Sequence, residues 1–206
     1  VLGDDAHLDL VGAALALART RYPDLDENTY DARLAALADD ARTDGDAAPE
    51  SRLAAIAEVL FGEQGIRGNS EDYYDPRNSY LNDVLDRRLG IPISISLVYL
   101  AIGWRMNLPI APVSFPGHFL VMLQTPQAPA LVVDPYNQGA LVSHEALVAQ
   151  LTRAVGSEGD ARRLLPRVLV PCDRREVLAR MLRNLDAIYT NRGEMEQALV
   201  VSDLAV

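Results

Sequence analysis

The stretch IPISISLVYLAIGWRM, residues 91–106, is the longest apolar run of the chain. Proline suits the first turn of a helix, where its missing amide proton would have no partner, so Pro92 marks a helix start. The segment is apolar on nearly all sides, which is typical of a helix buried in a core. It falls short of the roughly 20 residues that a membrane span requires. We therefore predict a buried central helix from Pro92 to about Asn107.

Helical periodicity dominates the chain before this run. Apolar residues recur at helical spacing in three segments, which are separated by the turn-forming runs YPD (22–24) and TDGD (43–46). A short helix that begins at Asn78 or Ser79 and ends near Gly90 leads into the central helix. The three segments predicted as packed amphipathic helices are residues 9–21, 29–42 and 51–61.

The apolar pattern changes to the two-residue period of strands after Pro109. Turns rich in Gly, Pro and Gln separate three short strands, and such brief connections favour antiparallel pairing. A further short strand is expected near Leu141, followed by a helix from His144 to Val155. The three strands are predicted at residues 110–115, 119–123 and 131–134.

The last part of the chain predicts a pair of helices. Asp173 and Glu176 have the spacing of a capping box ahead of an apolar helical pattern, and a second helix follows from Glu194. One helical pair buries its apolar face poorly, so we expect a longer natural protein that continues past Val206. We thus predict an α+β fold with a domain over residues 1–170, helical in 1–64 and carrying the core helix and sheet in 65–170, and a helical hairpin over 171–206.

The charge and the residue types exclude several functional classes. The formal net charge of −10 repels phosphate backbones, so nucleic acid is excluded as a partner. All 19 basic residues are arginine, which removes P-loop and Schiff-base lysines. Cys172 is the only cysteine, so an internal disulfide and a multi-cysteine zinc site are excluded. We expect no cofactor and no metal.

Neither a membrane span nor a secretory signal is visible in the sequence. Residues 1–6 carry no basic segment and no cleavage pattern. We therefore expect a soluble, cytoplasmic protein without a membrane partner.

His118 and Asp134 are the strongest candidates for acid–base chemistry. Imidazole is the usual proton-transfer group near neutral pH, and His118 starts a predicted strand after Pro116-Gly117. Asp134 closes a strand soon after, so neighbouring antiparallel strands bring the two together, with the carboxylate orienting the imidazole. A structural hydrogen bond is the alternative interpretation of the same pair. His7 lies near a terminus and His144 at a helix start, where a solvent or capping role suffices.

The segment from Asn69 to Ser79 is a long polar and aromatic loop, and loops of this size in compact domains are often functional. In one interpretation, buried Tyr rings and Asn side chains pin the loop over a cleft. In the other, the loop forms a lip that contacts a ligand or peptide. The sequence leaves both open. The binding candidates are Asn69, Tyr73, Tyr74 and Asn78, together with Ser94 and Ser96 on the central helix.

An ordered set of motifs resembles one protein family. The motifs are YYDPRNSYLN (73–82), GIPIS (90–94), FPGHFL (115–120) and DPYN (134–137). They resemble those of the SirB type of transglutaminase-like protein, in which they precede a tetratricopeptide-like tail. The closing segment RMLRNL (180–185) and the hairpin after it resemble that tail, so the resemblance spans nearly the whole chain. It implies a transglutaminase-like, papain-like core.

The resemblance also implies a place for each member of a catalytic triad. In that fold a Cys stands at the N-terminus of the buried helix, a His at the head of a strand, and an Asp on the next strand. His118 and Asp134 match the second and third members. Pro92 stands where relatives that keep the nucleophile have Cys. The helix dipole would stabilise a thiolate there, but proline has no nucleophile.

Three other side chains are weighed as replacement nucleophiles. Ser94 lies about 200° around the helix from Pro92, so it faces elsewhere. Ser96 lies near the face of Pro92 but one turn deeper, where a structural hydrogen bond is the alternative. Cys172 stands at a predicted helix start, and its alternative is a buried, inert thiol.

Two functions follow as expectations. The first is a degenerate transglutaminase-like module that binds an unknown partner protein through its cleft or its C-terminal helices. The second is an amide-bond hydrolase or acyltransferase that uses Ser96 or water with His118 and Asp134. A serine hydroxyl within hydrogen-bond reach of the His118 ring in an open pocket favours the second. A plugged cleft in which Pro92 faces His118 favours the first.

Overall fold

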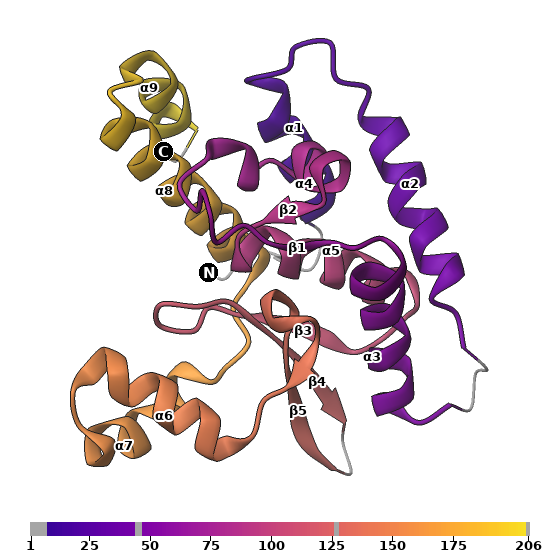
Figure 1. Ribbon diagram of the computed structural model, residues 1–206, viewed down its shortest axis with the longest axis vertical. Helices are drawn as coiled ribbons and strands as arrows, with labels where there is room; N and C mark the ends of the chain where they lie inside the picture. The colour runs from indigo at the N-terminus through magenta and orange to yellow at the C-terminus, as the bar shows by residue number, and fades with distance from the viewer. Residues whose placement is uncertain (1–7, 44–46, 126–127, 205–206) are drawn as a thin grey trace.

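Helices surround a small antiparallel sheet in the structure, a computed structural model that describes residues 8–43, 47–125 and 128–204. Figure 1 shows the helices of the N-terminal part on one side, the C-terminal hairpin on the other, and the sheet below them. This arrangement confirms the predicted α+β class. Two of our predictions lie outside the described residues. One is the absence of a secretory signal in residues 1–6, and the other is the turn between helices at residues 44–46.

The central helix α5 (Pro92–Arg105) is buried on every side, as predicted. Even its polar Tyr99 has an internal partner, because the hydroxyl donates to the carbonyl of Leu53 at 2.8 Å. The helix ends at Arg105 rather than at Asn107. Asn107 has a left-handed φ of 56°, which is incompatible with a right-handed helix. Among the described residues, no helix is both long and apolar enough to cross a bilayer.

The sheet lies against α5 and has two apolar faces. Its strands are β3 (Ile110–Val113), β4 (Leu120–Thr125), β5 (Ala128–Asp134) and β6 (Ala140–Leu141), adjacent in that order and antiparallel throughout, as predicted. Successive side chains of a strand point to opposite faces. One face joins the main core around α5 through Val121, Leu123 and Val133. The other forms a second core through Leu120, Met122 and Val132.

A helical hairpin covers the second face of the sheet. It consists of α6 (His144–Val155), as predicted, and α7 (Glu158–Val168), which the sequence reasoning missed. The start of α7 carries a readable signal, since the Ser157 hydroxyl accepts from the Asp160 amide at 3.3 Å and acids occupy the first turn. The interior Pro166 and a buried stripe of only Ala161 and Leu165 obscure the helical pattern.

The N-terminal helices pack around the other side of α5. They are α1 (Leu10–Arg19), α2 (Glu27–Asp40) and α3 (Pro49–Ala57), which continues as a π-helical turn, η2 (Glu58–Glu63). The carboxylates of Asp9 and Asp26 cap α1 and α2 by accepting from backbone amides. These elements confirm the three amphipathic helices predicted from the periodicity.

A two-residue parallel pairing connects the polar loop to the start of α5. β1 (Arg67–Gly68) pairs with β2 (Leu89–Gly90), and the Asn69 amide donates to the carbonyl of Gly90 at 2.9 Å. The chain between them forms the 3-10 turn η3 (Pro76–Asn78) and α4 (Leu81–Arg87). The polar loop thereby begins directly beside the segment that enters α5. Strands this short carry no periodicity, so they were not predicted.

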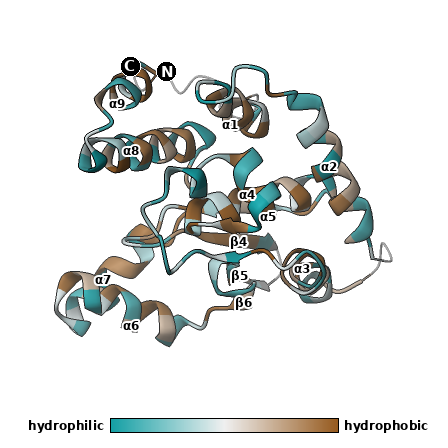
Figure 2. Ribbon diagram, turned by 45° about the horizontal axis from the view of Figure 1, so that its top comes forward, coloured by the Kyte–Doolittle hydropathy of each residue, from teal (hydrophilic) through white to brown (hydrophobic). Residues whose placement is uncertain are grey.

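The C-terminal hairpin consists of α8 (Arg174–Arg192) and α9 (Met195–Asp203). Its start is as predicted, because the Asp173 carboxylate accepts from the Glu176 amide at 2.6 Å. Val177, Met181 and Leu185 of α8 belong to the main core around α5. Figure 2 shows α8 above the brown, apolar strand β4, with the α6–α7 hairpin on the far side of that strand. Helix α8 is therefore part of the same packed body as α5.

A substitution at Gly68 can test the close packing between β1 and the turn after β5. A Cβ atom on Gly68 would overlap the ring of Tyr136. We expect Gly68→Ala to lower the free energy of unfolding by about 1–3 kcal/mol, because the ring or the strand must shift. Gly159→Ala in α7 is the control, since a Cβ there meets only Ser157 Oγ at 3.9 Å and should leave stability unchanged or raised. Equal losses in the urea midpoint of both variants would contradict this account of the packing.

Candidate functional site

The candidate site is built around a hydrogen bond between His118 and Asp134. Gly117 precedes the histidine with a φ of 69°, and the turn returns the chain into β4. Asp134 is the last residue of β5, and its Oδ2 lies 2.8 Å from His118 Nε2. Its Oδ1 accepts from the Asn137 amide at 3.2 Å, which fixes the carboxylate. The expected juxtaposition of the two side chains is therefore present, with 12% and 15% of them exposed.

The pairing determines which imidazole nitrogen remains for other partners. Because Nε2 of His118 meets the carboxylate, Nδ1 is the ring nitrogen left for a substrate or a second partner. The Tyr136 ring stands edge-on to the imidazole, with centroids 6.0 Å apart and planes at 85°. Tyr136 occupies this place because Gly68 leaves room for it. The imidazole is thus held by a carboxylate and by an aromatic wall.

Pro92 and His118 line the same small pocket, whose volume is about 50 Å³. Pro92 is the first residue of α5, where a nucleophile would benefit from the helix dipole. A pyrrolidine ring has neither a thiol nor a hydroxyl to offer there. The remaining lining residues come from the polar loop, the start of α5, the turn before β4 and α8: Tyr73, Ile91, Ile93, Gly117, Arg180 and Asn184.

Arg180 is a site residue that the sequence reasoning did not identify as one. Its guanidinium donates to the carbonyl of His118 at 2.8 Å and to Ser114 Oγ at 2.8 Å. It also lies over the Phe119 ring, 5.4 Å from the centroid. Burial lowers the pKa of Arg180 from its usual value. No local pattern could reveal this role, since the carbonyl it binds lies 62 residues away in the sequence.

The serines of α5 bond to backbone carbonyls rather than to the imidazole. Ser94 Oγ donates to the carbonyl of Asn78 at 2.6 Å and accepts from the Ile91 amide at 3.0 Å. Ser96 Oγ lies 3.5 Å from the carbonyl of Phe119, at the limit of a hydrogen bond. Both serines are fully buried. This placement differs from the expectation that they contact a ligand.

Cys172 is also poorly placed for nucleophilic chemistry. Burial raises the pKa of its thiol to about 11, so the thiolate is scarce at neutral pH. Its backbone amide donates to the carbonyl of Pro112 at 2.9 Å, which ties the segment before α8 to β3. These observations favour the inert interpretation of this cysteine.

Buried asparagines hold the polar loop in place. Asn69 Nδ2 donates to Asn78 Oδ1 at 3.1 Å, and Asn78 Nδ2 donates to the carbonyl of Asp72 at 2.7 Å. Asp75 is buried between Arg77 at 2.8 Å and Arg87 at 3.0 Å. Burial alone would raise the pKa of Asp75, but the hydrogen bonds and charges of the two arginines hold it below its usual range. Asn69 and Asn78 therefore bond inside the protein instead of facing solvent.

The two tyrosines of the loop are on the surface, unlike the asparagines. Tyr73 is 41% exposed and Tyr74 is 65% exposed, and their rings meet edge to face at 5.3 Å. They line a groove of about 100 Å³. Its other lining residues are Ile91 and, on α8, Asn184, Ala187, Ile188 and Asn191. Tyr73, Ile91 and Asn184 also line the His118 pocket. The groove along α8 and the His118 pocket are therefore adjacent. The asparagines pin the loop as one alternative expected, but its two tyrosine rings are exposed rather than buried.

The His118–Asp134 bond predicts a coupled effect on stability. We expect Asp134→Ala to lower the free energy of unfolding by about 1–3 kcal/mol, because it leaves the imidazole and the Asn137 amide without their acceptor. The double variant His118→Leu/Asp134→Ala should cost less than the sum of the single variants, since interacting residues couple. Denaturant midpoints of both singles and the double measure this. Singles of unchanged stability that abolish a measurable reaction would instead make the pair catalytic.

Comparisons with known proteins identify the family of the chain. A family model described as the transglutaminase-like superfamily matches residues 28–183. A UPF0162 protein of Xylella fastidiosa is 39% identical over 202 residues, which cover 97% of this chain and 72% of that protein. A UPF0162 protein of Vibrio cholerae is 30% identical over 201 residues, covering 97% of this chain and 73% of that protein.

A shorter similarity extends to animal proteins. F-box only protein 21 of Mus musculus is 48% identical over 69 residues, which cover 34% of this chain and 11% of that protein. No solved structure matches the chain significantly. The match to the family model and the near-complete coverage by bacterial relatives lead to one assignment: this chain belongs to the transglutaminase-like superfamily and to the UPF0162 family.

Proposed function

We propose that this chain is a degenerate transglutaminase-like module that binds a partner protein and does not perform cysteine-nucleophile chemistry. The observation that carries the proposal is Pro92, which lines the His118 pocket at the helix start where a nucleophile would stand. A fold can persist after its chemistry is lost, because the residues that hold the core are different from those that react.

The surroundings of His118 support the absence of a replacement nucleophile. Ser94 and Ser96 are fully buried, and their hydroxyls lie against backbone carbonyls. The raised pKa of Cys172, which is about 11, keeps its thiol protonated. The pocket of about 50 Å³ offers little room for an acyl group between Pro92 and His118. Each of these features removes one step that acyl transfer requires.

The groove beside this pocket supports a binding role. Tyr73 and Tyr74 present exposed aromatic rings, which are enriched among residues that dominate binding energies. Asn184 and Asn191 of α8 line the same groove and carry amide groups suited to a peptide backbone. We therefore assign the groove to an extended segment of a partner protein, with an apolar side chain near Ile91 and Ile188.

The C-terminal hairpin forms part of the same proposal. We assign residues 171–206 to a tetratricopeptide-like tail of the SirB type, appended to the domain over residues 1–170. Helical repeats commonly present extended binding surfaces. Helix α8 carries Asn184 and Asn191, so the hairpin provides one wall of the groove. The partner would then contact both the transglutaminase-like part and the tail.

One observation favours a second candidate function. The His118–Asp134 hydrogen bond of 2.8 Å uses Nε2 of the imidazole, so Nδ1 is the ring nitrogen left to act on a substrate or water. A water molecule activated by this pair would give an amide-bond hydrolase, and an acyltransferase would need Ser96 as nucleophile. The Ser96 route is the weaker one, because that hydroxyl is fully buried.

Restoring the nucleophile tests the assignment of Pro92. The natural chain should form no acyl-enzyme with glutamine donors, and its alkylation by iodoacetamide should not depend on His118. In Pro92→Cys, we expect the new thiol to be alkylated at pH 7 at least about tenfold faster than Cys172, because the helix dipole and His118 favour its thiolate. Mass spectrometry of labelled peptides distinguishes the two cysteines.

The control is the double variant Pro92→Cys/His118→Ala, whose new thiol should lose most of this advantage. A thiol at position 92 that reacts no faster than Cys172 would show that the nucleophile position is misassigned. An acyl-enzyme on the natural chain would overturn the non-catalytic proposal.

A charged residue in the groove tests the binding surface. Tyr74→Arg places a cation on an exposed part of the groove. We therefore expect the full-length Tyr74→Arg variant to capture less of the partner protein than the full-length natural sequence does. Val155→Arg is the matched control, because Val155 is 38% exposed at the end of α6 and does not line the groove. Quantitative mass spectrometry of captured proteins compares the two variants with the natural sequence. Equal capture by both variants would refute the groove as the binding surface.

A further inference from the structure

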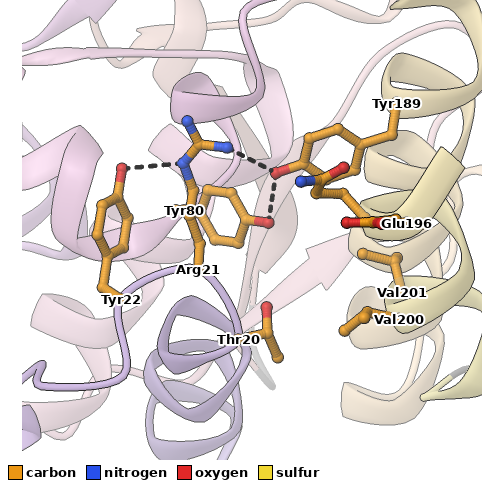
Figure 3. Close-up of a pocket in the computed structure, with 9 residues that line it drawn as sticks. Thr20, Arg21, Tyr22, Tyr80, Tyr189, Glu196, Val200 and Val201 are labelled. Atoms are coloured by element: carbon orange, nitrogen blue, oxygen red, sulfur yellow. Dashed lines mark hydrogen bonds between the residues drawn. The ribbon is translucent and has the colours of Figure 1, made fainter. Parts of the chain in front are cut away.

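A second and larger pocket lies between the end of α1 and the C-terminal hairpin. Its volume is about 490 Å³, which falls within the range of roughly 300–1,000 Å³ typical of small-molecule sites. None of its lining residues belongs to the His118 pocket or to the groove beside Tyr74. Figure 3 shows Arg21, Tyr80, Tyr189 and Glu196 around it, with Val200 and Val201 along one wall.

Arg21 supplies a positive charge without a direct acidic partner. Its Nη1 donates to Tyr189 Oη at 3.2 Å and its Nε donates to Tyr22 Oη at 3.3 Å. Asp83 lies near enough for the charge of Arg21 to act on it, but its Oδ2 accepts from the Tyr22 hydroxyl at 2.7 Å rather than from the guanidinium. Within the described part of the chain, no carboxylate forms an ion pair with Arg21. The guanidinium is therefore available to a carboxylate from outside.

Two buried tyrosines form a firm polar floor beside this charge. The hydroxyls of Tyr80 and Tyr189 lie 2.8 Å apart, and both side chains are almost fully buried. Either hydroxyl can be the donor, and each has its partner inside the protein, so the pair holds its position without a ligand. The rings of Tyr22 and Tyr80 meet edge to face at 6.2 Å, which further fixes Tyr80.

Helix α9 supplies the opposite charge and an apolar wall. Glu196 is exposed, and among the described residues no cation is paired with it. Val200 lies one helical turn further along and is 46% exposed, while Val201 is buried beside it. In Figure 3, Arg21 and Glu196 lie on either side of the Tyr80–Tyr189 hydroxyl pair. A ligand that contacts both charges must span that pair.

We propose that this pocket binds a short apolar peptide with free termini, of about dipeptide length. Arg21 holds the terminal carboxylate through paired N–H donors, and Glu196 holds the terminal ammonium. The apolar side chains lie on the exposed Val200, and the peptide backbone crosses the buried tyrosine pair. A residue of extended chain spans about 3.3–3.6 Å, so a dipeptide is long enough to cross the Tyr80–Tyr189 hydroxyl pair, whose oxygens lie 2.8 Å apart.

Calorimetric titration with L-leucyl-L-leucine tests the proposal. We expect saturable binding to the natural sequence. Affinity should fall roughly tenfold or more for the N-acetylated and for the C-terminally amidated dipeptide, because each lacks one charged hydrogen-bonding end. Absence of measurable binding up to millimolar dipeptide, or equal binding of the blocked forms, would overturn it.

Matched variants locate the site. Arg21→Gln should weaken binding of the dipeptide roughly tenfold or more, whereas Arg19→Gln should not, because Arg19 pairs with Glu27 outside the pocket. Glu196→Gln should weaken the free dipeptide but not its N-acetylated form. Glu196 is exposed, so Glu196→Gln should not disturb the fold. It therefore still tests the site if Arg21→Gln disturbs the packing of the tyrosines. Unchanged affinity in Glu196→Gln would overturn the assignment of the ammonium end.

One further variant separates this site from the groove. Tyr74→Arg should leave dipeptide affinity unchanged, because Tyr74 does not line this pocket. A loss of dipeptide affinity in Tyr74→Arg would place the dipeptide in the groove and overturn the proposal. The proposed partner binding at the groove can therefore fail while this site stands, and the reverse also holds.

Discussion

The burial of α5 on all sides from Pro92 to Gly103 is the constraint on which the rest of the structure depends. A helix that is apolar on every side is stable in water only when other elements cover all of its faces. The N-terminal helices cover one side, and the sheet and α8 cover the others. The contact with the sheet is close, since a Cβ atom on Gly103 would overlap Ile110. Because α5 is held so firmly, its first residue, Pro92, has a fixed place beside His118.

The candidate site combines a hydrogen-bonded frame with a proline at the start of α5. The His118–Asp134 bond, the edge-on Tyr136 ring and the Arg180 guanidinium are hydrogen-bonded or packed as a unit. Such networks stabilise a fold even where no reaction uses them, because each buried polar group satisfies another. The frame therefore explains how a transglutaminase-like core can keep its shape with a proline at the helix start.

Helix α8 contributes residues to two separate pockets, the His118 pocket and the pocket that contains Arg21. Arg180 and Asn184 face the His118 pocket, while Tyr189 belongs to the pocket that contains Arg21. Between these positions, the apolar side of α8 joins the main core through Leu182 and Leu185. A helix packed in this way positions both sets of side chains on one rigid element, which favours precise geometry over adaptability.

Local patterns in the sequence predicted most of the helices and strands, because periodicity and caps act over a few residues, but they did not predict α7, β1 or β2. Pro92 and the apolar run after it predicted α5, and the two-residue alternation predicted the antiparallel strands that bring His118 to Asp134. Apart from the His118–Asp134 pair, only the tertiary structure decided which polar groups are buried and which meet across the chain. Arg180 binds a carbonyl 62 residues away, and Arg21 meets Tyr189 across 168 residues. Contacts at such separations depend on how whole elements pack, and no short stretch of sequence encodes that packing.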